Sequence, residues 1–287
     1  MSEPTLNYVP CADTGAGHRM AYWQWGEPGN PHVVVCVHGI SRQGRDFDEL
    51  AKALSPHVRV VAVDVVGRGA SDWLQDPMHY QLPQYAQDLA TLLPQLNAGT
   101  IDWVGTSMGG LIGMAVCAQE QSPVRRLVLN DVGPVIQPAA VARIAGYLGA
   151  DKRSATVQEG ADYLWSISAS FGPHTPSQWL AFSTPMFKAD AGGFKLHYDP
   201  AIALAVKAVT PESAAEGEAL LWQLYDRIQA RTLLLRGADS DLLSPATARA
   251  MTQRGPRARL LEFAGVGHAP TLLTPEQIAP IADFLLQ

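Results

Sequence analysis

Short runs of mostly apolar residues recur along the chain without the polar alternation expected of a half-exposed strand. They lie at 33–37, 58–66, 100–104, 124–131, 232–237 and 258–263. Helix-like segments follow most of them, and the chain closes with another at 275–286. Strands that are buried on both faces have this pattern, which is typical of a parallel sheet between two layers of helices. We therefore predict an α/β fold, with a mostly parallel central sheet flanked by helices. An alternating segment at 18–25 predicts a half-buried strand paired with 6–9.

The strand–helix rhythm breaks between about Pro134 and Asp226, which predicts an inserted region. This segment is helix-like, is punctuated by prolines and carries half of the chain's 22 aromatic residues. These side chains either build the core of a small helical layer or line an apolar pocket beneath a lid. The two interpretations are compatible with each other. We predict an α/β core at 1–133 and 227–287 and a helical cap at 134–226. The pocket is predicted to be lined by His38, Trp165, Trp179, Phe182 and Phe187.

The sequence Gly105-Thr-Ser107-Met-Gly109 matches the pattern G-x-S-x-G, directly after an apolar strand and before a helix of small residues. A nucleophile at the tip of such a tight turn requires small flanking residues, because strand and helix approach each other closely. The alternative is a glycine-rich helix start in which Ser107 only caps the helix. The strand–turn–helix setting favours Ser107 as a nucleophile.

A glycine also follows the strand run at 33–37, in the sequence His38-Gly39-Ile40. Gly39 allows the backbone to turn, so that the amides of Ile40 and Met108 are predicted to form a two-donor oxyanion hole. His38 itself is interpreted as a structural hydrogen-bonding residue rather than a base. The segment DVVGRGAS at 64–71 lacks the patterns of phosphate-binding loops, and we interpret it as a turn that braces the neighbouring strand.

His268 lies in a glycine-flanked loop between the last strand run and the C-terminal helix. A general base needs a mobile imidazole that solvent can reach and whose pKa lies near neutral pH. The flanking glycines give the side chain room to move, so His268 is the predicted base. The acid that orients it should follow a strand near this loop. We select Asp241, in the sequence GADSD, and the alternatives are Asp239 and Asp131. The order serine, aspartate, histidine is the one expected with this type of turn.

Charge and composition limit the partners. The chain has 21 Lys and Arg against 27 Asp and Glu, a net charge of −6, which argues against a broad nucleic-acid-binding surface. No apolar run approaches the roughly 18 residues of a membrane span. The first residues do not resemble a secretory signal, and the three cysteines form neither a disulfide framework nor a metal-binding spacing. We predict a cytoplasmic monomer or homodimer with no metal, no cofactor and no nucleic-acid partner.

Taken together, the motifs resemble the α/β-hydrolase fold superfamily. The resemblance covers essentially the whole chain and rests on HG at 38–39, DVVGRGAS at 64–71, GTSMGG at 105–110, GADSD at 237–241 and GVGH at 265–268. It implies a helical cap at 134–226, a triad of Ser107, Asp241 and His268, and oxyanion donors at Ile40 and Met108. Haloalkane dehalogenases and epoxide hydrolases are disfavoured, because those branches carry aspartate at the nucleophile position, where this chain has Ser107.

These features predict a serine hydrolase that cleaves a small or medium carboxylic ester with an apolar portion through an acyl-enzyme. The same scaffold also serves C–C bond hydrolases acting on vinylogous diketones, lactonases, and cofactor-free haloperoxidase side activities, so these remain alternatives. A hypothesis from another class is a non-catalytic receptor that keeps the triad as a ligand pocket.

Overall fold

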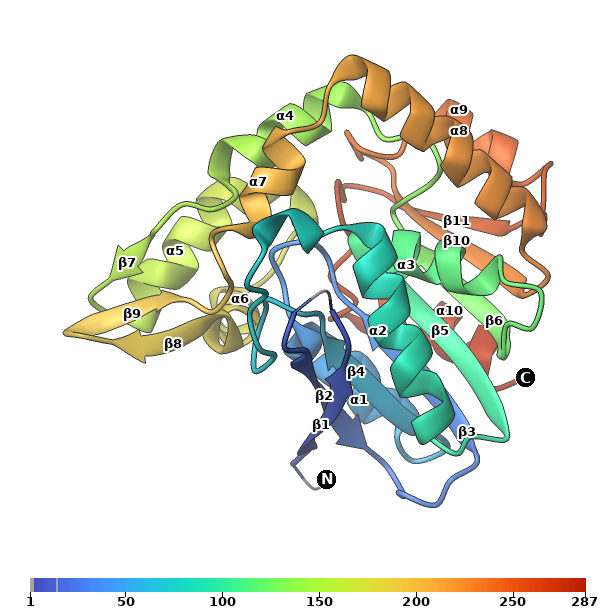
Figure 1. Cartoon of the computed structure of the whole chain (residues 1–287), viewed down its shortest axis with the longest axis horizontal. Helices are drawn as coiled ribbons and strands as arrows, with labels where there is room; N and C mark the ends of the chain where they lie inside the picture. The colour runs from blue at the N-terminus through green and yellow to red at the C-terminus, as the bar shows by residue number, and fades with distance from the viewer. Residues whose placement is uncertain (1–2, 14) are drawn as a thin grey trace.

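The computed structural model describes residues 3–13 and 15–287, so residues 1, 2 and 14 of the predicted core lie outside the described part. An eight-stranded sheet with the order β1-β2-β4-β3-β5-β6-β10-β11 forms its centre (Figure 1). Neighbours from β4 to β11 are parallel, and β1 and β2 add an antiparallel hairpin at one edge. The strands are Thr5–Cys11 (β1), His18–Trp25 (β2), His32–Val37 (β3), Arg59–Asp64 (β4), Thr100–Thr106 (β5), Val124–Asn130 (β6), Arg231–Gly237 (β10) and Arg259–Phe263 (β11).

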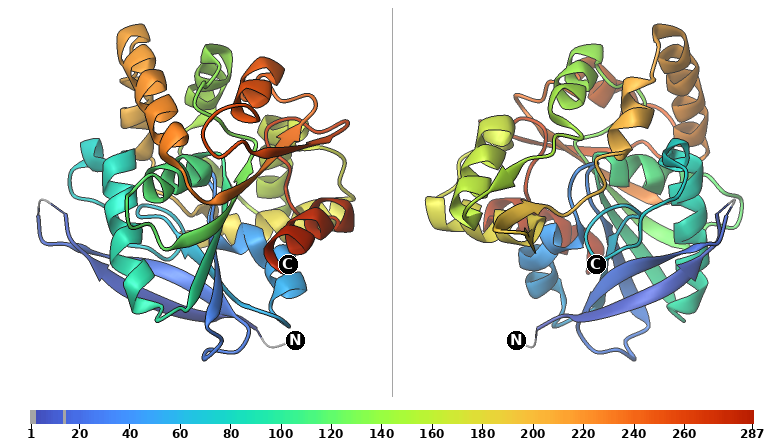
Figure 2. Two further views of the ribbon diagram at one scale, coloured as in Figure 1. Left: turned by 90° about the vertical axis from the view of Figure 1, so that its right-hand side faces the viewer. Right: turned by 60° about the vertical axis from the view of Figure 1, so that its left-hand side comes forward.

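Helices cover both faces of this sheet (Figures 1 and 2). Alternate residues of β3 belong to different layers: Val35 and Val37 pack into the cluster that contains α2 and α3, whereas Val34 and Cys36 pack against α1 and α10. All four side chains are fully buried. The α/β prediction is therefore confirmed, and burial on both faces explains why the strands have continuous apolar sequences. The core helices are Asp48–Leu54 (α1), Leu82–Gln95 (α2), Met108–Cys117 (α3), Pro245–Met251 (α9) and Pro275–Leu285 (α10).

The predicted inserted region leaves the core after β6 and returns to it at β10. It contains the helices Pro138–Tyr147 (α4), Val157–Ser168 (α5), Pro176–Ser183 (α6), Ile202–Lys207 (α7) and Pro211–Arg227 (α8). It also contains a three-stranded antiparallel sheet that the sequence analysis did not predict, formed by Arg153–Ser154 (β7), Phe187–Asp190 (β8) and Gly193–Leu196 (β9). These strands are too short to give a clear period, but Gly192, at a φ of +79°, marks the hairpin turn between β8 and β9. In the described ranges, no helix has the length and apolar character needed to cross a membrane.

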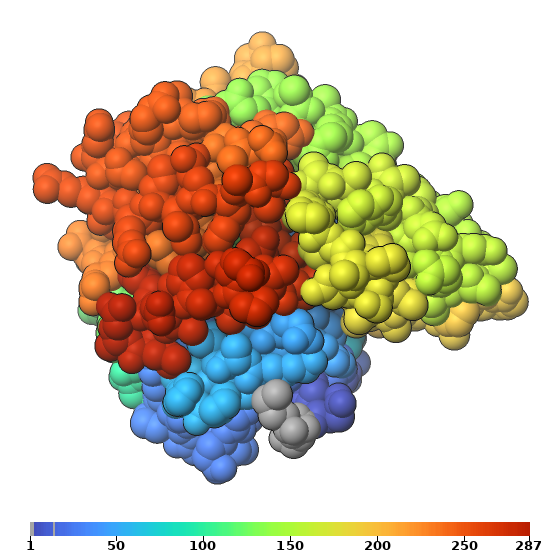
Figure 3. Space-filling model, turned by 180° about the vertical axis from the view of Figure 1, so that it is seen from behind, coloured from blue at the N-terminus to red at the C-terminus, as the bar shows by residue number. Residues whose placement is uncertain are grey.

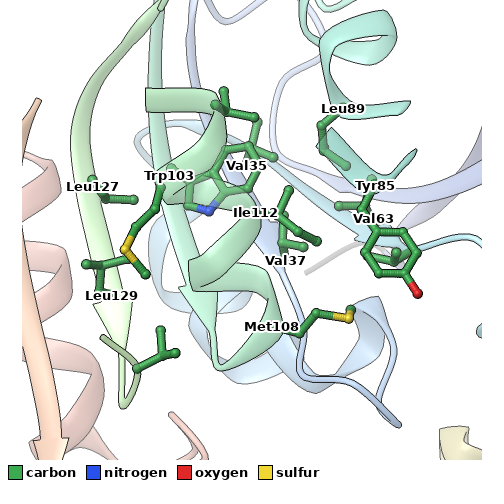
Figure 4. Packing of buried hydrophobic residues seen from close by; sticks show 14 of the residues in the cluster. Val35, Val37, Val63, Tyr85, Leu89, Trp103, Met108, Ile112, Leu127 and Leu129 are labelled. Atoms are coloured by element: carbon green, nitrogen blue, oxygen red, sulfur yellow. The ribbon is translucent and has the colours of Figure 1, made fainter. Parts of the chain in front are cut away.

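The turn between β5 and α3 brings three backbone segments into very close contact. A Cβ atom on Gly105 would lie 2.3 Å from the Gly109 carbonyl oxygen, and a Cβ on Gly109 would lie 1.9 Å from the Val37 carbonyl oxygen. Trp103 of β5 packs beneath α3 and donates its indole N–H to the Gly109 carbonyl over 3.1 Å (Figure 4). Only glycine fits at either position, so the two glycines of the motif have the steric role expected of them.

Replacing Gly109 with alanine should destabilise the fold by about 3 kcal/mol or more, because the added methyl group collides with rigid backbone rather than a movable side chain. Equilibrium denaturation in urea would measure the change in the free energy of unfolding. Gly217→Ala is the matched control, since Gly217 lies within α8 and a Cβ there meets nothing within 4 Å. That variant should gain about 0.5–1 kcal/mol from helix propensity. Equal stabilities for the two variants would contradict the steric argument.

Candidate active site

Ser107 stands at the N-terminus of α3 in a conformation that few non-glycine residues adopt, with φ at 51° and ψ at −116°. Its carbonyl accepts hydrogen bonds from the amides of Gly110 and Leu111, and its own amide donates to the Asn130 carbonyl over 3.0 Å. These bonds, together with the close glycine contacts, hold the serine at the tip of the turn. Its side chain therefore faces the pocket at the carboxyl ends of the strands.

His268 joins Ser107 to a buried carboxylate. Its Nε2 lies 3.0 Å from the Ser107 Oγ, and its Nδ1 lies 2.8 Å from Oδ2 of Asp131. An ionised carboxylate only accepts hydrogen bonds, so Nδ1 carries the proton. Nε2 is then free to accept the proton of the serine hydroxyl, which is the arrangement that activates a serine nucleophile.

The predicted partner of His268 was Asp241, and the structure places Asp131 there instead. Asp131 is fully buried in the loop after β6. Its Oδ1 accepts the Gly237 amide over 2.9 Å, and its Oδ2 accepts the Ser240 hydroxyl over 2.7 Å in addition to His268. Three donors therefore hold this carboxylate in place. The GADSD segment contributes to the site through the Ser240 hydroxyl and the Gly237 amide rather than through a carboxylate.

The path of the histidine loop explains why Asp131 is the partner. The loop follows β11, yet it crosses over β10 toward β6, where Asn130 donates its side-chain amide to the Pro270 carbonyl over 2.8 Å. The same amide group donates to the Thr106 hydroxyl over 3.0 Å, which ties the loop to the end of β5 as well. His268 is thereby brought to the end of β6, which is the neighbour of β5, the strand that precedes Ser107.

Asp241 forms a two-point ion pair with Arg143 of α4, with N–O distances of 2.7 and 2.9 Å. Its side chain is 42% exposed. Partial desolvation raises the pKa of this carboxyl, but the hydrogen bonds and charge of Arg143 outweigh that effect and hold the pKa below its usual value. Asp241 therefore links the core to the inserted region and leaves the orientation of His268 to Asp131. Asp239, the other carboxylate in this segment, is exposed.

The residues around the predicted oxyanion hole are held by buried hydrogen bonds. The ring of His38 donates from Nδ1 to the Gly39 carbonyl and accepts the Val65 amide at Nε2 over 3.0 Å. Burial lowers the pKa of His38 to about 3, so the ring is neutral and structural. Arg68, from the DVVGRGAS segment, donates to the Ile40 carbonyl over 2.9 Å, which agrees with the bracing role proposed for that turn.

The Ile40 and Met108 amides both lie beside the serine. Ile40 lines the same pocket as Ser107, and Gly39 approaches so closely that its Cβ would lie 3.7 Å from that of Ser107. Met108 contributes no side chain to the pocket, because it packs into the core near Tyr85 (Figure 4). In the described part of the chain, neither amide N–H has a protein acceptor, so both remain available to a substrate oxygen.

A pocket of about 610 Å³, including its mouth, opens over Ser107 and His268 between the core and the inserted region. Its wall combines Gly39, Ile40, Ser41, Arg42, Asp46, Phe47 and Thr106 from the core and Ala269, Pro270 and Thr271 from the histidine loop. The inserted region adds Arg143, Ile144, Tyr147, Phe171 and Phe182. Among the residues predicted to line the pocket, Phe182 does so, and His38, Trp165, Trp179 and Phe187 do not.

Trp179 and Phe187 pack within the inserted region, whereas Trp165 contacts Trp179 from an exposed position. Trp179 is buried, donates its N–H to the Ala161 carbonyl over 2.8 Å and contacts Trp165 edge-on, with ring centroids 5.0 Å apart. Phe187 packs against Gly160 of α5. The insert therefore uses Trp179 and Phe187 in its own packing rather than in the pocket wall. Arg42, Arg143 and Tyr147 were missed, and their positions in the pocket could not be recognised without knowing how the insert sits on the core.

The inserted region also contacts the histidine loop directly. The Gly267 amide donates to the Ser170 carbonyl over 2.6 Å, and His174 lies 2.8 Å from the Thr271 hydroxyl. Figure 3 shows this part of the insert, in yellow and green, side by side with the orange and red C-terminal part of the core. The loop that carries His268 is thus held by the core on one side and by the insert on the other.

One cluster outside the pocket brings together groups that can bind metals, which the cysteine spacing did not predict. Cys11, His18 and Asp88 are buried with their ligand atoms within 4.8 Å of one another. His18 and Asp88 already form a hydrogen bond of 2.9 Å. Burial lowers the pKa of His18, but the charge and hydrogen bond of Asp88 outweigh that effect and raise it overall. This interaction explains the cluster as an ion pair between the N-terminal hairpin and α2.

Comparison with known proteins identifies the family of the chain. Residues 34–281 match the alpha/beta hydrolase family. The 3-hydroxybutyrate-oligomer hydrolase of Cupriavidus necator is 48% identical, over 99% of this chain and 98% of its own. A poly(3-hydroxyalkanoate) depolymerase of Ectopseudomonas oleovorans is 26% identical, over 91% and 87%. The crystal structure of an alpha/beta hydrolase from Novosphingobium aromaticivorans superimposes with a TM-score of 0.87 at 35% identity, over 100% of this chain and 99% of that one.

The chain belongs to the alpha/beta hydrolase family. The predicted fold class, family and ester-hydrolase activity are confirmed by these relationships.

The identity of the acid can be tested by comparing three aspartate-to-asparagine variants with p-nitrophenyl butyrate as substrate. Asp131→Asn should lower kcat by roughly 10³- to 10⁴-fold, because an amide in place of the carboxylate favours the wrong tautomer of His268. Asp241→Asn should cost less than about tenfold, since it does not touch the imidazole. Asp239→Asn is the exposed control. A larger loss of kcat in Asp241→Asn than in Asp131→Asn would restore the original assignment.

Proposed function

We propose that the protein hydrolyses short oligomers of 3-hydroxybutyrate through a covalent acyl-enzyme on Ser107. The observation that carries the chemistry is the continuous hydrogen-bonded chain from Ser107 through His268 to Asp131. The choice of substrate is supported by the 48% identity, over nearly the full length of both chains, with a hydrolase of these oligomers. A largely apolar pocket with a few charged groups suits a short aliphatic hydroxy acid ester.

In this mechanism the Ser107 Oγ attacks the ester carbonyl carbon while His268 Nε2 takes the hydroxyl proton. Asp131 keeps the imidazole in the required tautomer and stabilises its charge once it is protonated. The negative oxygen of the tetrahedral intermediate is received by the Ile40 and Met108 amides. His268 then gives its proton to the departing alkoxide, which leaves as the hydroxyl group of a hydroxybutyrate unit.

Deacylation repeats these steps with water. His268 accepts a proton from the water that attacks the acyl-enzyme carbonyl, and returns it to the Ser107 Oγ as the second product leaves as a free acid. The chain's own residues supply the nucleophile, base, acid and oxyanion donors, so each proton transfer in the cycle has a named group.

Incubation of the purified protein with the 3-hydroxybutyrate dimer and trimer, with products separated by chromatography, tests the proposal. We expect release of 3-hydroxybutyrate, and a fall in kcat of roughly 10³-fold or more in Ser107→Ala, because a triad member acts as part of a unit. Ser166→Ala is the matched control, since Ser166 is exposed on α5 and bonds only to its own helix.

Two results would contradict the proposal in different ways. Cleavage of p-nitrophenyl esters that depends on Ser107, without cleavage of the oligomers, would support the serine mechanism but show that the proposed substrate is wrong. Tight oligomer binding without turnover of any ester would favour the receptor hypothesis.

A further inference from the structure

Two arginines line the pocket that contains Ser107, and each is paired with a carboxylate. Arg42 lies in the loop that follows β3, and Arg143 lies on α4 of the inserted region. A permanent positive charge beside a reactive serine is a specific binding group for an anionic part of the substrate. The surroundings of the two guanidinium groups differ, and the difference decides which of them can take a ligand.

Arg42 is nearly buried, so little of its guanidinium can be reached by a ligand. Its Nε and Nη2 each lie 2.7 Å from Asp46 oxygens, and Nη2 also reaches the Phe182 carbonyl over 3.3 Å. Its guanidinium carbon lies 4.1 Å from the centre of the Phe182 ring, and the side chain is only 9% exposed. Arg42 therefore serves to fix Phe182 and the wall of the pocket.

Arg143 is held through the same edge of its guanidinium as Arg42, but its side chain is much more exposed. Asp241 accepts its Nε and Nη2, while Nη1 makes no hydrogen bond to that carboxylate. The guanidinium also interacts with the Tyr147 hydroxyl, one helical turn further along α4. Arg143 is 33% exposed, so its remaining edge can be reached from the pocket. A planar guanidinium positioned in this way presents donors in a fixed direction.

Tyr147 adds a second donor at the same place. Burial raises the pKa of Tyr147, although the positive charge of Arg143 opposes the shift. The hydroxyl therefore keeps its proton over the whole range in which an ester hydrolase works, and can donate it in a hydrogen bond. An arginine and a phenol on one helix face, both lining the pocket, match the two oxygens of a carboxylate.

We propose that Arg143 and Tyr147 form a carboxylate-binding subsite that holds the free acid end of the oligomer. This inference rests on the proposed function. In a dimer, two chain carbons separate the scissile ester oxygen from the terminal carboxyl carbon, so one pocket must receive both groups. The unit held at Arg143 is then the leaving group, and each cycle releases one hydroxybutyrate from the acid end. The substrate class is thus an ester with a free carboxylate, rather than a neutral ester.

The ion pair with Asp241 is compatible with this role. Because Asp241 is 42% exposed, solvent screens its repulsion of a second carboxylate. The Arg42–Asp46 pair is neutral overall and contributes no competing charge. Asp241 is a positioning residue here, since it fixes one edge of the guanidinium and leaves the other edge for the substrate.

The experiment compares the 3-hydroxybutyrate dimer as free acid with its methyl ester, and the quantity measured is the ratio of their kcat/KM values. The wild-type protein should favour the free acid by at least tenfold. Arg143→Gln and Arg143→Met should each lower this ratio ten- to a hundredfold, mainly through a higher KM for the free acid, as expected for loss of a charge-assisted hydrogen bond that is present in both ground and transition states. Tyr147→Phe should lower the ratio by a smaller factor.

Arg153→Gln is the matched control, since Arg153 is an exposed arginine of the inserted region that pairs with Asp190 outside the pocket. Its ratio should equal that of the wild type. A wild-type protein that prefers the methyl ester, or Arg143 variants that lose both substrates equally, would overturn the subsite while oligomer cleavage itself still supports the proposed function. Failure of the wild type to cleave either dimer would overturn the proposed function as well.

Discussion

The contact between Gly109 and the Val37 carbonyl is the constraint on which the site depends. It holds the start of α3 against the end of β3. The strand that precedes Ser107 (β5) and the strand that precedes Ile40 (β3) therefore have a fixed spacing. With that spacing set, Ser107 adopts its unusual backbone conformation, and the segment that carries Gly39 and Ile40 lies beside it. The surrounding layers are a conventional three-layer packing, and the reactive geometry comes from a few backbone atoms that approach more closely than any side chain would allow.

The second constraint is the buried carboxylate of Asp131. Its three donors come from two segments, Gly237 and Ser240 at the end of β10 and His268 in the histidine loop, so one side chain ties both segments to the end of β6. A buried charge is tolerated only when its oxygens are satisfied in this way. The hydrogen bonds that satisfy the carboxylate also set the orientation of His268. The same hydrogen bonds of Asp131 therefore stabilise these loops and orient His268 to act as a base.

Sequence patterns were sufficient for the sheet, Ser107 and His268, because each depends on local rules: continuous apolar strands, small residues at a tight turn and a glycine-flanked loop. They were insufficient for Asp131, because the choice among three aspartates depends on a loop that crosses β10. The contacts that hold this loop, such as the hydrogen bond from Asn130 to the Pro270 carbonyl, join residues far apart in the sequence. The prediction of the residues that line the pocket was mostly wrong for a similar reason. Trp165, Trp179 and Phe187 are typical pocket aromatics by composition, but their positions are decided by packing within the insert.

The inserted region is attached to the core at the ends of two adjacent parallel strands, β6 and β10, so its entry and exit lie next to each other. Both ends are fixed by the sheet regardless of what lies between them, and lengthening such a segment costs little loop-closure entropy. The serine, histidine and carboxylate all belong to the core, whereas Arg143 and Tyr147 belong to the insert. Changes within the insert can therefore alter which esters are admitted while the reactive residues stay in place, provided that the contacts of Ser170 and His174 with the histidine loop are kept.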